Sequence, residues 1–173
     1  EGPWLNRIGG IAAIVGALLG LFGNLLHPET AAPGAPETAR VIAESQIWIP
    51  LHIGLIAGFM LMLGGLVAIQ RSMSSGLAGA LARLGVVAAI VGTSVGIIDL
   101  TTDGFASRHL AIAWLDAPED QMAFALASFQ AEQAIDFALL SPLNFIFAGF
   151  TFVLFGLANA VGDTYPRWLG WIA

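Results

Sequence analysis

The sequence predicts an all-α membrane protein, a transmembrane bundle of four helices with the start of a fifth and an amphipathic outer helical arm. The chain is 57% hydrophobic and only 10% charged, and its mean hydropathy is +0.83, whereas soluble domains carry about 25% charged residues. Several windows of roughly 20 apolar residues are each long enough to cross a hydrocarbon core of about 30 Å. We therefore treat residues 1–173 as a single transmembrane helical domain.

The first span is expected at about residues 5–26, where an Arg lies near its start and a His-Pro pair ends it. Gly16, Gly20, Asn24 and His27 follow one another at spacings of four, four and three. This spacing places them on one helical face. Small residues on that face favour close packing against a neighbouring helix.

Residues 28–46 form a polar outer loop that contains several Pro and Gly residues. A short amphipathic helix is expected at 37–44 within this loop. The second span follows at about 47–69. Trp48 at its start is of the type that anchors helices at the membrane interface.

The third span is expected at about 77–100, where small residues recur on one face at Gly85, Ala89, Gly92 and Gly96. Asp99 and Asp103 continue the same face. Residues 101–140 are expected to form an outer helical region. We expect Pro142 to divide this arm from the fourth span at about 141–161, because proline disrupts a helix interior.

Arginine positions predict the orientation of the chain. Arg7, Arg71, Arg83 and Arg167 fall on one side of the spans, while Arg40 and Arg108 fall on the other. Cytoplasmic loops are enriched in basic residues, so we expect a cytoplasmic N-terminus in a bacterial inner membrane. Ten of the twelve acidic residues then lie on the outer side, which creates a field that attracts cations.

Composition also excludes several classes of function. The chain has no Cys, and all six basic residues are Arg. Thiolate metal ligands, Cys-ligated iron–sulfur clusters, Lys Schiff bases and a Walker lysine are therefore excluded. The sequence has no basic patch, so we expect a lipid bilayer and no nucleic acid as its partner. It has no nucleophile-elbow motif, and it identifies no catalytic residue.

Titratable residues gather at the outer ends of the predicted spans, and they are His27, His52, Asp99, Asp103, Glu132 and Asp136. Such groups are costly near hydrocarbon and are functional candidates by default. Counting about 1.5 Å per residue from the inner arginines brings the two histidines and the first two aspartates to one level. We expect His27 and His52 to bind a cofactor such as haem b, or a transition-metal ion to bind His27, His52, Asp99, Asp103 and Asp136.

Several of these titratable residues also have a structural explanation that requires no functional site. His52 points away from the Gly face of its helix and could sit alone at the interface. Asp99 could form a helix-tying pair with Arg108. Asp136 lies about 10 Å higher than the other groups if its helix is straight, and Glu132 could lie on a solvated face. His109 is expected on a solvated surface.

The His-Pro pair at residues 27–28 and the sequence Tyr-Pro-Arg-Trp-Leu-Gly-Trp at 165–171 resemble features of uncharacterised small polytopic bacterial membrane proteins. This resemblance implies no activity. Three hypotheses remain open: a His/carboxylate site that binds a metal ion or haem, an accessory subunit of a larger membrane complex that docks through a Gly58–Gly65 face, and a small transporter.

Overall fold

The computed structural model describes residues 2–73 and 75–172, and these residues form helices joined by short loops. The helices in chain order are α1 Gly2–Leu25, α2 Pro36–Glu44, α3 Trp48–Ser72, α4 Gly76–Thr101, η1 Thr102–Ser107, α5 Arg108–Leu115, α6 Met122–Leu143, η2 Asn144–Thr151, α7 Phe152–Val161 and η3 Arg167–Trp171. The described residues include no strand. The all-α prediction is confirmed.

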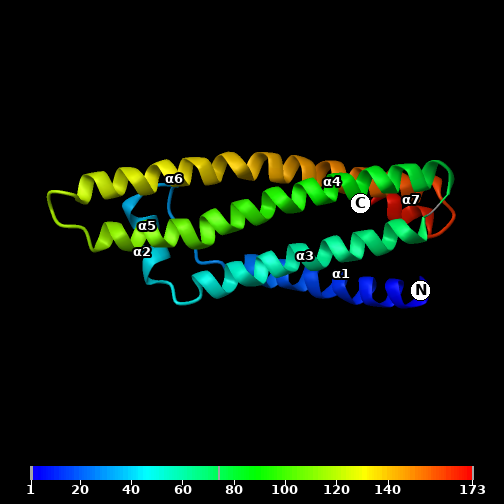
Figure 1. Cartoon of the computed structure of the whole chain (residues 1–173), viewed down its shortest axis with the longest axis horizontal. Coiled ribbons are helices and arrows are strands. Elements are labelled where there is room, and N and C mark those ends of the chain that lie inside the picture. The colour runs from blue at the N-terminus through cyan, green and yellow to red at the C-terminus, as the bar shows by residue number, and fades with distance from the viewer. Residues whose placement is uncertain (1, 74, 173) are drawn as a thin grey trace.

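Four helical stretches are long and apolar enough to cross a membrane, namely Trp4–Leu25, Trp48–Ser72, Gly76–Leu115 and Met122–Val161. The last two contain 40 residues each, which corresponds to about 60 Å at 1.5 Å per residue. They are therefore about twice as long as the hydrocarbon core is thick. Figure 1 shows them running the length of the molecule, while α1 and α3 accompany them over only part of it.

The helix from Met122 to Val161 continues through Pro142, so the predicted division at this residue is wrong. Proline removes a backbone donor and pushes against the preceding turn. The wider π-helical turns of η2 begin two residues later, and such turns accommodate a disturbed hydrogen-bond ladder without ending the helix. The predicted outer region 101–140 is helical apart from the turn that joins α5 to α6.

The small-residue faces of α1 and α3 pack against each other. A Cβ atom at Gly16 would lie 2.7 Å from the backbone oxygen of Gly58, and one at Gly65 would lie 2.6 Å from the Cβ atom of Ala13. Only glycine permits this approach of the two backbones. The Gly58–Gly65 face predicted to receive another subunit is therefore covered by α1.

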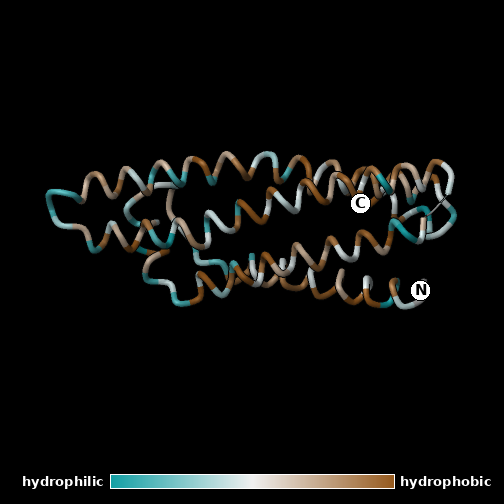
Figure 2. Tube along the Cα trace, in the orientation of Figure 1, coloured by the Kyte–Doolittle hydropathy of each residue, from teal (hydrophilic) through white to brown (hydrophobic). Residues whose placement is uncertain are grey.

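The bundle has two distinct ends. The chain termini lie toward one end, here called the terminal end, and α2 packs against α5 at the other, the α2 end (Figure 1). At the α2 end a hydrophobic cluster joins Ala39, Ile42, Trp48, Ala111, Trp114 and Phe129. Figure 2 shows hydrophobic colour along the middle of the bundle and hydrophilic colour in the connecting loops at its two ends.

The segment that resembles the start of a fifth span is a short 3-10 helix, Arg167–Trp171. It packs against α7, where a Cβ atom at Gly170 would lie 2.4 Å from the backbone oxygen of Gly156. Within residues 2–73 and 75–172 the structure thus places four candidate spans and no fifth.

Candidate metal centre

Three helices bring His27, His52 and Asp103 together at the α2 end. His27 lies just beyond α1, His52 is in the second turn of α3, and Asp103 belongs to the π-helical segment η1. One ligand atom from each residue can be chosen so that all three lie within 4.8 Å of one another. Imidazole nitrogen and carboxylate oxygen are both ligands for divalent transition metals.

The buried His52 side chain is held at both ring nitrogens. Its Nδ1 atom lies 2.7 Å from the backbone oxygen of Trp48, and its Nε2 atom lies 2.8 Å from Oδ2 of Asp103. Because a carbonyl only accepts hydrogen bonds, Nδ1 carries a hydrogen atom. In the neutral ring Nε2 then carries the lone pair, which points toward Asp103 and can bind a cation at this position.

His27 repeats this arrangement. Its Nδ1 atom lies 3.1 Å from the backbone oxygen of Pro28, and its Nε2 atom lies 3.8 Å from the same Asp103 oxygen. Interaction with the Asp103 carboxylate raises the pKa of the His27 imidazole above 6.5, against the opposing effect of burial. The same carboxylate that attracts a proton to this ring would attract a metal cation to it.

Neighbouring groups fix the orientation of these side chains. The indole nitrogen of Trp48 donates to the backbone oxygen of Asp103 at 3.0 Å, and its ring packs against both His27 and His52. A Cβ atom at Gly104 would lie 2.6 Å from the Cβ atom of His52, so glycine allows η1 to approach the imidazole. The sequence interpretation gave Trp48 only an interfacial role, although its position one turn before His52 was a signal of contact.

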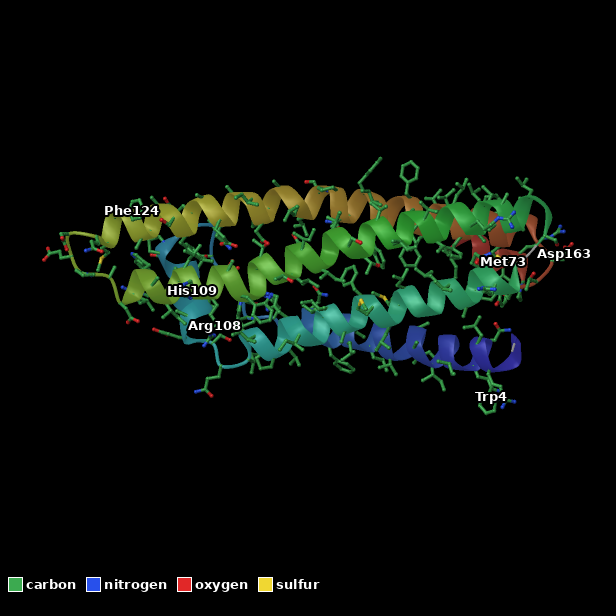
Figure 3. The ribbon with its side chains drawn as sticks, viewed as in Figure 1. Trp4, Met73, Arg108, His109, Phe124 and Asp163 are labelled. Atoms are coloured by element: carbon green, nitrogen blue, oxygen red, sulfur yellow. The ribbon has the colours of Figure 1, made fainter. Side chains whose placement is uncertain are left out.

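A cavity of about 270 Å³ adjoins the three residues, and its lining includes Asp99 and Asp136. Asp99 therefore shares a cavity with both histidines, as the depth count predicted. It does not pair with Arg108, whose guanidinium instead donates to the backbone oxygens of Ile42 and Ser45. Figure 3 shows Arg108 and His109 at the α2 end, and His109 is exposed as expected.

Asp136 lines the same cavity as Asp99, although residue counting predicted a position about 10 Å higher. The count assumed a straight α-helix from Asp163, whereas the eight residues of η2 are π-helical and rise less per residue, which accounts for part of the difference. Glu132 is also buried, but it is not part of the cavity lining. Its carboxylate accepts hydrogen bonds from Ser107 at 2.8 Å and from Gln133 at 3.5 Å, so it ties α6 to η1.

Comparison with other proteins finds no matching family model, no matching curated protein and no matching solved structure. The resemblance to small polytopic bacterial membrane proteins therefore stays a prediction.

Proposed function

We propose that this multi-pass membrane protein binds a divalent transition-metal ion through His27, His52 and Asp103. The observation that carries the proposal is the shared arrangement of the two imidazoles. Each places its Nδ1 hydrogen on a backbone carbonyl and directs Nε2 at one oxygen of Asp103. Metal-binding histidines typically donate their second ring N–H to a carbonyl or carboxylate, which fixes the tautomer and the ring orientation.

The donor set defines the class of ion. Two neutral imidazoles and one carboxylate suit zinc, iron, manganese, cobalt or nickel, and the absence of Cys from the chain removes the thiolates that favour Cu(I). Three protein ligands leave at least one coordination position for water or a substrate. The adjoining cavity of about 270 Å³ provides room for such a molecule.

Haem fits this arrangement less well than a single ion. Two axial histidines must approach the iron from opposite faces of the macrocycle, so the plane between them has to be clear of protein. Here both Nε2 atoms are directed at the Asp103 carboxylate, which lies 2.8 Å from His52 and 3.8 Å from His27. The geometry therefore supports metal-ion binding over haem binding.

The metal-binding proposal is tested by loading the purified protein with Co²⁺, whose visible spectrum reports coordination by imidazole. We expect one Co²⁺ per chain and loss of the spectrum in His27→Ala. His109→Ala is the matched control, because His109 is exposed and lies outside the site. Equal Co²⁺ binding by the two variants would contradict the proposal. A metal-free protein that copurifies with a larger complex would support the accessory-subunit hypothesis instead.

We further propose that the site faces the outside of a bacterial inner membrane, as the arginine asymmetry predicts. The native chain has no Cys, so single cysteines introduced at Ala31 and Thr164, both exposed, report the orientation directly. An impermeant thiol reagent applied from outside should label position 31 and not position 164. Labelling of position 164 alone would indicate the opposite orientation and contradict this proposal.

A further inference from the structure

Two carboxylates in the same cavity lack the partners that buried charges require. Asp99 is only 7% exposed, and its Oδ1 atom makes no hydrogen bond among the described residues. The Oδ1 atom of Asp136 is likewise buried without a partner. With Asp103, these residues place three carboxylates around one cavity.

The two histidines that line the cavity pair with Asp103. The residues that line the cavity include neither Arg nor Lys, and the guanidinium of nearby Arg108 is engaged by two backbone oxygens. Burying a carboxylate without a compensating charge costs several kcal/mol, and the cost persists at membrane depth. A bound cation would remove it.

The metal ion proposed at His27, His52 and Asp103 does not meet this need. Asp99 and Asp136 do not belong to the group whose ligand atoms lie within 4.8 Å of one another. A transition-metal ion binds its ligands at only about 2.0–2.2 Å, so in this arrangement it would not reach Asp99 or Asp136.

We propose that Asp99 and Asp136 hold a second cation of the hard, oxygen-binding class, such as Mn²⁺ or Mg²⁺, beside the transition-metal ion. This inference rests on the proposed metal-binding function of the same cavity. Carboxylate and amide oxygens suit these ions. Gln133 also lines the cavity and is 5% exposed, and because its amide nitrogen donates to Ser107 at 2.9 Å, its amide oxygen is available as a further ligand.

The test uses the full chain, first loaded with Zn²⁺ and then titrated with Mn²⁺ while electron paramagnetic resonance distinguishes free from bound Mn²⁺. We expect one Zn²⁺ and one Mn²⁺ per wild-type chain. Asp99→Asn and Asp136→Asn should each weaken Mn²⁺ binding at least about tenfold and leave one Zn²⁺ bound. Asp163→Asn is the matched control, since Asp163 is an exposed acid at the terminal end (Figure 3).

The possible failures are distinguishable. A wild-type protein that binds one Zn²⁺ and no Mn²⁺ would overturn the second position while leaving the first intact. The same conclusion follows if Asp99→Asn and Asp163→Asn bind Mn²⁺ equally. Failure to bind Zn²⁺ would instead contradict the proposed function. The wild-type stoichiometry provides this result even if a variant fails to fold.

Discussion

Two of the pockets in the bundle are of similar size and opposite chemistry. The pocket at the terminal end has a volume of about 350 Å³ and is lined almost entirely by apolar groups, from Leu66, Ile69, Met73, Phe152, Phe155, Gly156, Asn159, Tyr165 and Leu169. The cavity at the α2 end has about 270 Å³ and contains two histidines and three aspartates. Pocket size therefore does not identify the candidate site. The free-energy cost of burying its titratable groups does.

Both ends contain a hydrophobic cluster, but the α2 end adds long-range hydrogen bonds of its titratable side chains. Phe155 at the terminal end packs in a cluster with Leu66, Met73, Ala82, Ala89 and Ala158. At the α2 end, long-range hydrogen bonds link His52, Trp48 and Asp103. We expect substitutions at the terminal end to change stability, and substitutions at the α2 end to change metal binding.

The largest effect on stability is expected from Phe155→Ala. Removing a buried aromatic side chain leaves a cavity and costs about 3–5 kcal/mol, and Phe155 is only 6% exposed. Thermal unfolding in detergent should show this loss, while Co²⁺ affinity stays unchanged. Phe145→Ala is the control, because Phe145 is 65% exposed and should have little effect. A loss of Co²⁺ affinity in folded Phe155→Ala would show that the two ends are coupled.

Asp103→Asn should lower the affinity for Co²⁺ rather than the stability of the protein. The variant removes the charge at which both imidazoles are directed, so Co²⁺ affinity should fall by at least about 100-fold, beyond the range typical of outer-shell changes. Isothermal titration measures the change. A variant that retains wild-type affinity would exclude Asp103 as a ligand.

Gly104→Ala should weaken metal binding without removing any ligand. The added Cβ atom would lie 2.6 Å from His52, so the imidazole must move away from its position. We expect Co²⁺ affinity to fall by about 10–100-fold. Gly54→Ala provides the control, since a Cβ atom there meets nothing within 4 Å. Equal Co²⁺ affinities in the two variants would indicate that metal binding does not depend on the position of His52.

The smallest effect is a dependence on pH. The raised pKa of His27 means that its pairing with Asp103 stabilises the metal-free protein fully below about pH 6.5 and that this contribution is lost as pH rises through the raised value. Protons compete with metal for the same nitrogen, so the increase in melting temperature caused by Zn²⁺ should grow as pH rises through this range. An increase in melting temperature that is independent of pH would argue against His27 as a ligand.

Hydropathy and spacing could predict much of this fold. The four spans follow from apolar length, and the common level of His27 and His52 follows from counting residues along each span. The orientation of His52 away from the Gly face of α3 was also predictable, because helical spacing assigns residues to faces. Its nearest neighbour on that side, η1, lies about 50 positions later in the chain.

Other features depend on tertiary structure and could not be predicted. Pro142 does not end its helix, because the π-helical turns of η2 that follow accommodate it. The backbone oxygen of Trp48 selects the tautomer of His52, but sequence spacing does not show which ring nitrogen a carbonyl meets. The Gly58–Gly65 face could be recognised as a packing surface, while its partner, α1, could not be distinguished from another subunit.

The central claim is tested most directly by X-ray absorption at the zinc edge of the Zn²⁺-loaded protein. We predict two imidazole nitrogen ligands at about 2.0–2.1 Å together with oxygen ligands at about 2.0–2.2 Å, and the loss of one imidazole contribution in His27→Ala. Zinc coordinated by oxygen alone, or an unchanged spectrum in His27→Ala, would contradict a metal centre at His27, His52 and Asp103.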